Sequence, residues 1–249
     1  MIPRFAPAVV RFPLFRSKAV ETSLHRELKA WYGPGSGGRQ EVTLGGYRVD
    51  AVGPDGVIVE VQSAALGPLR GKLGRFLPGS KVRVVKPVVV ARRVVRRARR
   101  DGADLSARFS PKRGQLADVF DDLVGLARVF PHPNLQIDVL AVEIDVVRVV
   151  RRRRPGYSVV DRRLRRVVAG VSLRDAADLW GLLPDDGPGG PFTARALAEH
   201  LGRPLAFAQR VAYCLRLSGA VEAVGKSGNQ RVYRRIGAAV CPSCERYPA

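Results

Sequence analysis

The chain has 249 residues, of which 46% are hydrophobic, and this is enough for one large domain or two small domains with a real core. Its formal net charge of +21 is large and of one sign, which indicates a polyanionic partner, most often nucleic acid, with an anionic membrane surface or a ribosome-like assembly as alternatives. The 3 cysteines exclude a disulfide framework and no apolar run reaches the length of a membrane span, so we expect a cytoplasmic protein with no membrane segment.

The N-terminal part is predicted to be an extended arm followed by a helix. Residues 1–17 contain prolines and arginines that interrupt the apolar core a signal peptide would need. Residues 18–31 place apolar side chains, including Leu24 and Leu28, at helical spacing. The loop 33–38 is rich in glycine, but it lacks the Lys-Ser/Thr pair and the preceding strand of a phosphate-binding P-loop, which excludes that motif.

Two apolar segments, residues 47–50 and 57–62, are predicted to form a hairpin around the turn 53–56. In the Pro-Asp-Gly of this turn, the proline fixes its own φ angle and the glycine accepts a positive φ angle. The second segment alternates between valines on one face and other side chains on the opposite face. Asp50 and Glu60 would then sit near each other, and two carboxylates can share a hard divalent cation such as Mg²⁺, which prefers oxygen ligands.

This hairpin resembles the core motif of the PD-(D/E)XK nuclease superfamily, which has the restriction-endonuclease-like fold. The shared pattern is an Asp, then a spacer, then a Glu-x-Gln on the next strand. In this resemblance Asp50, Glu60 and the carbonyl of Val61 hold Mg²⁺ or Mn²⁺. Gln62 takes the place of the usual lysine, a substitution found in active restriction enzymes and in inactive relatives. Glu27 on the preceding helix is placed to complete the acidic set. The resemblance implies an α/β (α+β) fold with an αβββαβ core, and a metal-dependent deoxyribonuclease that hydrolyses phosphodiester bonds.

The wider layout is also similar to an uncharacterised bacterial family with this hairpin, a Ser-Pro-Lys-Arg-Gly segment, a His-Pro-Asn segment and a C-terminal winged helix. This similarity covers most of residues 21–236. The alternative interpretation is that both acidic residues face solvent on a scaffold that has lost its chemistry, because folds are reused without their activity.

Basic residues follow the hairpin on a predicted helix, 63–77, and after a buried strand, 81–91. The arginine-rich run 92–100 is interpreted as strand because an Asp-Gly turn and another short strand, 105–109, come next. Clustered like charge costs stability without counter-ions, which favours phosphate contacts over a merely solvated surface. The predicted contacts are Arg70, Lys72, Arg75, Arg92, Arg96 and Arg100.

The first domain is predicted to span residues 18–183. Its later elements are a helix 115–130, a strand 135–150, a basic turn 151–156, a further segment 157–168 and a helix 173–182. Three acidic side chains of the first of these helices, Asp118, Asp121 and Asp122, could suggest a metal cluster, but a solvated face beside the basic run is the preferred interpretation.

Residues 192–236 are predicted to form a winged helix-turn-helix after a linker at 184–191 that is rich in proline and glycine. Its second helix, 204–218, would enter the major groove of DNA while the wing tip touches phosphate, although such domains also pack on protein partners. The candidate contacts are Gln209, Arg210, Tyr213, Arg216, Lys226 and Arg231.

The last residues, 237–249, are predicted to be a flexible tail. Cys241 and Cys244 form half of a zinc-ribbon pattern, and Cys214 is expected inside a helix. One chain therefore lacks four suitable ligands, so zinc is not expected, and a homodimer stays open.

Two functions compete on the sequence alone. The first is a Mg²⁺-dependent DNA endonuclease, and the second is a catalytically inactive nuclease-like module that binds DNA or regulates. A component of an RNA–protein assembly would explain the charge but not the acidic hairpin, so DNA is preferred over RNA as the partner.

Overall fold

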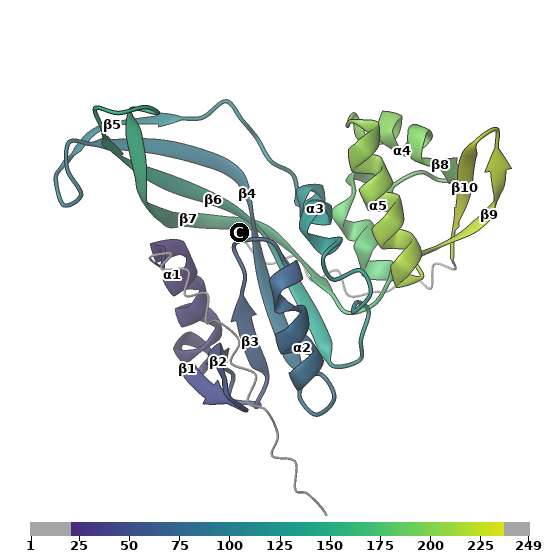
Figure 1. Ribbon diagram of the computed structural model, residues 1–249, viewed down its shortest axis with the longest axis horizontal. Coiled ribbons are helices and arrows are strands. Elements are labelled where there is room, and N and C mark those ends of the chain that lie inside the picture. Colours follow the sequence, from purple (N-terminus) through teal and green to yellow (C-terminus); the bar gives the residue numbers. More distant parts are fainter. Residues whose placement is uncertain (1–20, 237–249) are drawn as a thin grey trace, which may run out of the picture.

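The computed structural model describes residues 21–236 (Figure 1). The predicted arm 1–17 and the tail with Cys241 and Cys244 lie outside the described residues. The chain is an α+β protein in which a large mixed sheet carries a few short helices, as the general fold class predicted. Within residues 21–236, no helix is long and apolar enough to cross a membrane.

Within the described residues, the large sheet has 7 strands in the order β1-β2-β3-β4-β6-β7, with β5 paired to β4. The strands are β1 Arg39–Leu44, β2 Tyr47–Val52, β3 Ile58–Val61, β4 Val82–Arg97, β5 Asp104–Phe109, β6 Leu135–Val150 and β7 Tyr157–Leu173. The central strands β3, β4 and β6 are parallel, and the outer pairs are antiparallel. The predicted arginine-rich strand therefore exists, because β4 runs through the valines and on to Arg97.

Helices cover both faces of this sheet. Helix α1, Ser23–Tyr32, packs Leu24 and Leu28 against Val59 and Val61. On the opposite face Ile58 joins a second core with α2, Arg70–Phe76, and α3, Phe120–Leu123. The period-2 alternation predicted for the second hairpin strand is confirmed, since its neighbouring residues enter different cores.

Three predicted helices are shorter than expected. In place of a helix over 115–130 there is a 3₁₀ turn, Leu116–Val119, followed by the single-turn α3. After α3 the chain passes close to another segment at Gly125, where an added Cβ would lie 2.6 Å from the backbone nitrogen of Gly67, so only glycine fits at this position. A 3₁₀ turn also begins the segment 63–77, and the predicted helix 173–182 is a 3₁₀ segment, Ala177–Leu182, after β7 ends.

The C-terminal unit contains two helices and a small sheet, at the right of Figure 1. Its elements are β8 Phe192–Thr193, α4 Ala194–Leu201, α5 Leu205–Ser218, β9 Val221–Ser227 and β10 Gln230–Arg235. Thr193 caps α4, because its Oγ1 accepts a hydrogen bond from the Ala196 N–H at 3.2 Å.

This C-terminal unit shares a hydrophobic core with the large sheet. One cluster of buried side chains includes Phe120 and Leu126 beside α3 together with Val211 and Leu215 of α5. The segment 184–191, predicted as a linker, therefore joins two parts that are packed on each other.

The three aspartates around α3 stay half-buried or exposed, in keeping with the predicted solvated face, but each also forms an ion pair. Asp118 lies 2.7 Å from Arg203 and Asp121 lies 2.6 Å from Arg210, both on the C-terminal unit. Asp122 lies 2.7 Å from Lys86 of β4. These contacts hold α3 between the sheet and α5.

Candidate active site

Asp50 and Glu60 lie next to each other on β2 and β3, as the hairpin predicted. The Asp50 N–H donates to Oε1 of Glu60 at 3.3 Å, and the Val61 N–H donates to Oδ2 of Asp50 at 2.9 Å. Glu60 is only 6% exposed, so this carboxylate is part of the interior instead of a solvated hairpin surface.

Helix α1 supplies the other neighbours of Asp50. The Nε2 atom of His25 lies 3.4 Å from Oδ1 of Asp50, and Nζ of Lys29 lies 3.9 Å from the same oxygen. The two helical residues are four apart, so they lie on one face of α1. Neither residue is among the site residues predicted from the sequence.

Lys29 is buried, with 5% of its surface exposed, and joins carboxylates from two other segments. Its Nζ donates to Oε1 of Glu21 at 2.8 Å and to Oε1 of Glu41 at 2.7 Å. Glu41 has a φ of +54°, a left-handed conformation that is uncommon for a residue with a side chain. We call Glu21, Lys29, Glu41 and Asp50 the lysine hub.

Glu27 does not complete the acidic set, and that prediction is wrong for this arrangement. It is exposed on another side of α1, where the charges that influence its pKa are those of Asp161, Arg26 and Arg163. The physical reason is helical phase, because a residue two positions from His25 points away from the face that meets Asp50.

Lys72 lies beside Glu60, and a second lysine, Lys86, binds the loop that follows β3. Nζ of Lys72 donates to Oε1 of Glu60 at 2.6 Å and to the carbonyl of Arg48 at 2.6 Å, so Lys72 is not the free phosphate contact that was predicted. Lys86 is 3% exposed and donates to the carbonyl of Ala64 at 2.7 Å. A lysine within a run of valines was a sequence signal for a buried, partnered charge.

Gln62 follows Glu60 at the end of β3, abreast of Lys86. Its Nε2 donates to the carbonyl of Ala65 at 2.9 Å, so this amide closes its own loop. The loop after β3 is thus held by Gln62 from within and by Lys86 from the neighbouring strand.

The environment separates the pKa values of the two carboxyl groups. Burial alone would raise the pKa of Asp50, but hydrogen bonds from His25 and the Val61 N–H and the charge of Lys29 hold it below its ordinary value. Burial raises the pKa of Glu60, the Lys72 ammonium offsets this only in part, and the charge of Asp50 raises it further. Carboxyl groups with separated pKa values suit different roles in one site.

We expect a carboxyl-carbon NMR titration to show Asp50 below 3.8 and Glu60 above 4.5. Asp50 then contributes stability above its unfolded pKa that is lost as pH falls through its folded pKa. The stability contribution of Glu60 depends on pH in the opposite direction. It is complete below the unfolded pKa of Glu60 and is lost as pH rises through its folded pKa. A measured pKa of Asp50 that is higher than that of Glu60 would contradict this assignment.

Several of the predicted nucleic-acid contacts remain at the surface. Arg70, Arg75, Arg96 and Arg100 are exposed, and Arg92 is half-buried on β4. At the wing, Lys226 and Arg231 are exposed and face each other in the β9–β10 register.

Helix α5 presents fewer contacts than predicted. Arg210 pairs with Asp121 at 2.6 Å, because that side of α5 packs on α3. Gln209, Tyr213 and Arg216 lie at helical spacing on a stripe that stays exposed or half-buried.

Among residues 21–236, no group of three or more His, Cys, Asp or Glu side chains is arranged to hold a metal ion. Protein oxygens for a cation near the hairpin therefore come from the two carboxylates and from backbone carbonyls. Cys214, the cysteine inside α5 as predicted, is buried, and burial raises its pKa to about 12.

Comparison with known proteins identifies a family whose description names no activity. The model of a family described as "Domain of unknown function (DUF8091)" matches residues 22–174, which is more than half of the chain. An "Uncharacterized protein" of Treponema pallidum (strain Nichols) is 34% identical over 224 residues, covering 86% of this chain and 85% of that protein. No solved structure matches.

Proposed function

This chain belongs to the DUF8091 family, and from the geometry of its hairpin we propose that it binds DNA and hydrolyses phosphodiester bonds at a Mg²⁺-dependent site built on Asp50 and Glu60. The observation that carries the proposal is the pair itself: two carboxylates on adjacent strands, linked through the Asp50 N–H and largely withdrawn from solvent. Withdrawing two carboxylates this close together from solvent is costly even with Lys29 and Lys72 nearby, and a catalytic role accounts for that cost.

The order of elements around the pair supports the same proposal. Helix α1, three strands, helix α2 and strand β4 follow one another as in the restriction-endonuclease-like core, with β4 parallel to β3. The C-terminal order of two helices and a hairpin is that of a winged helix, which supports DNA as the partner.

The donor set suits Mg²⁺, which is typically held by one or two carboxylates and otherwise by waters and substrate phosphates. Asp50, Glu60 and the carbonyl of Val61 would hold the ion. When bound, it would supply a water of lowered pKa and stabilise charge on the phosphate.

The chain's own groups have separate tasks in this site. The hydrogen bonds to Asp50 keep its carboxylate ionised and oriented. Lys72 of α2 places a positive charge beside Glu60, which the neutral amide of Gln62 does not provide. Because the Gln62 amide closes its own loop, we assign it to shaping the site and not to proton transfer.

The second candidate function is a non-catalytic DNA-binding module, and the lysine hub favours it. Lys29 already provides a cation to Glu21 and Glu41 and lies 3.9 Å from Asp50. Lys72 likewise neutralises Glu60. A site whose charges are internally matched has less need of a metal.

Cleavage of supercoiled, linear and branched DNA by the full chain distinguishes the two. We expect cutting with Mg²⁺ or Mn²⁺ that stops with chelator and in Glu60→Ala, while DNA binding survives. Binding without cutting by both proteins would establish the non-catalytic module instead.

A further inference from the structure

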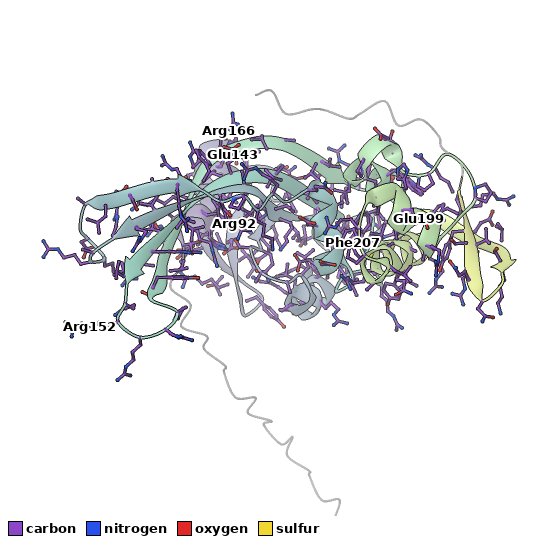
Figure 2. All side chains as sticks on the ribbon, turned by 90° about the horizontal axis from the view of Figure 1, so that it is seen from above. Arg92, Glu143, Arg152, Arg166, Glu199 and Phe207 are labelled. Atoms are coloured by element: carbon purple, nitrogen blue, oxygen red, sulfur yellow. The ribbon has the colours of Figure 1, made fainter. Side chains whose placement is uncertain are left out.

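The strands β4, β6 and β7 continue beyond the core that they share with α1, and Ile144 and Val146 of that core lie at the start of the extension. Together with β5 they form a four-stranded extension, at the left of Figure 1, which we call the arm and define as residues 91–109 and 143–166. Figure 2 shows Arg152 at the tip of its β6–β7 turn. The arm lies at the opposite end of the molecule from the β9–β10 hairpin (Figure 1).

The strand register sorts the charges of the arm onto two faces. Residues directly paired across strands share a face, and residues two apart along a strand share it too. By strand register, one face carries the four carboxylates of the arm strands, which are Asp104, Glu143, Asp145 and Asp161, and Asp161 also accepts hydrogen bonds from Ser23 of α1 at 2.9 and 2.7 Å. They pair with arginines, for example Arg93 with Asp145 at 2.6 Å and Arg166 with Glu143 at 2.9 Å, the latter two lying together in Figure 2. We call this the paired face.

The other face carries arginines without acidic partners. In the cross-strand register, Arg108 is paired with Val94, Arg148 with Arg96, and Arg162 with Val146. We call this the arginine face, and its basic residues are Arg92, Arg96, Arg108, Arg148 and Arg162. Within the described part of the chain none of the five forms a salt bridge.

Two of these side chains are held against the sheet. The guanidinium of Arg148 stacks on the ring of Tyr157 at 4.0 Å. The Nε atoms of Arg92 and Arg148 are buried without a hydrogen-bond partner. Their charges are therefore fixed in place before any ligand arrives, which lowers the entropy cost of binding.

We propose that the arginine face of the arm is a docking surface for the phosphate backbone of double-stranded DNA. Five like charges on four adjacent strands repel one another, and a polyanion relieves that repulsion. The four residue steps from Arg92 to Arg96 advance about 13 Å along β4. One DNA strand offers a phosphate about every 3.4 Å along the helix axis, so several phosphates fall within reach of the face.

This inference rests on the proposed DNA-binding function and names where the backbone lies. A hollow at the arm tip, lined by Arg99, Arg100 and Arg151, adds charge next to the same strands. Contacts to the phosphate backbone carry no information about the bases, so we expect binding at this face to be independent of the DNA sequence.

The test compares two triple variants of the full chain that lose the same charge. The first is Arg96→Gln, Arg108→Gln and Arg162→Gln on the arginine face. The matched control is Arg113→Gln, Arg165→Gln and Arg166→Gln, three arginines whose charges act on Glu143 of the paired face. Affinity for a labelled duplex of about 30 base pairs is measured from about 50 to about 300 mM KCl, with cleavage and thermal unfolding in parallel.

We expect the arginine-face variant to reduce the slope of log K against log salt by about 2 to 3, and to weaken binding at least about tenfold near 100 mM, while the control changes the slope by less than about 1. Equal losses in both variants, or unchanged slopes in both while wild type still binds, would overturn the docking surface and leave the DNA-binding function standing. Loss of binding to phosphatidylserine vesicles with unchanged DNA binding would overturn it in favour of a membrane. Failure of wild type to bind the duplex at the lowest salt would refute both proposals.

Discussion

Asp50→Asn is expected to lower Mg²⁺-dependent DNA cleavage by about 10³-fold without unfolding the protein. The amide oxygen of asparagine can still accept the hydrogen bond from the Val61 N–H, which spans 2.9 Å in the wild type. The variant therefore keeps the local hydrogen bond but loses the negative charge needed for a metal ligand. Initial rates of supercoiled-plasmid nicking, with circular dichroism of the folded protein, measure both effects.

Asp55→Asn is the matched control for this variant. Asp55 lies in the turn of the same hairpin, is exposed, and accepts a hydrogen bond from the Val57 N–H at 3.3 Å. The same carboxylate-to-amide change there should leave cleavage within about twofold of wild type. Equal activity of Asp50→Asn and wild type would remove Asp50 from the catalytic site.

Lys29→Met is expected to destabilise the protein by about 2 kcal/mol, which is about a 30-fold change in the folding equilibrium. Methionine retains the packing of the aliphatic stem, so the variant removes mainly the charge. Three carboxylates are then left near one another without their cation. The figure lies below that for fully buried pairs because Glu21 and Glu41 are 36% and 40% exposed, and solvent screens them. Urea unfolding at neutral pH measures the change.

Arg26→Met on the same helix provides the comparison for this loss. Arg26 is exposed and its Nη2 donates to Oγ of Ser23, so its replacement should change stability by no more than about 0.5 kcal/mol. The difference between Lys29→Met and wild type should also shrink as pH falls through the lowered pKa of Asp50, because that carboxylate then loses the charge that faces Lys29. A difference that is constant with pH would mean that packing and not charge explains the loss.

Local patterns predicted the strands and the central pair well. The turn at residues 53–56 and the alternation of β3 are short-range features, and they place Asp50 beside Glu60 as expected. The strand interpretation of the arginine-rich run also holds through Arg97, since an Asp-Gly turn after such a run favours a hairpin.

The partners of the pair could not be predicted because they depend on helical phase and long-range packing. A shift of two residues along α1 separates Glu27, which faces away, from His25, which approaches Asp50. Lys72 was assigned to phosphate because its position on a basic helix does not reveal that Glu60 lies beneath it. The pattern around α3 predicted a long helix, whereas the structure has a 3₁₀ turn and a single helical turn there, and the close approach of Gly125 to Gly67 is a long-range contact that local pattern does not reveal.

The core shared by α3 and α5 sets a limit on how this chain can be divided. The family match ends at residue 174, whereas Phe120 and Leu126 are covered by Val211 and Leu215 from beyond that point. A fragment cut at the family boundary would present this apolar surface to water and would be prone to aggregate. The segment that the family model matches is thus smaller than the unit that shares one hydrophobic core.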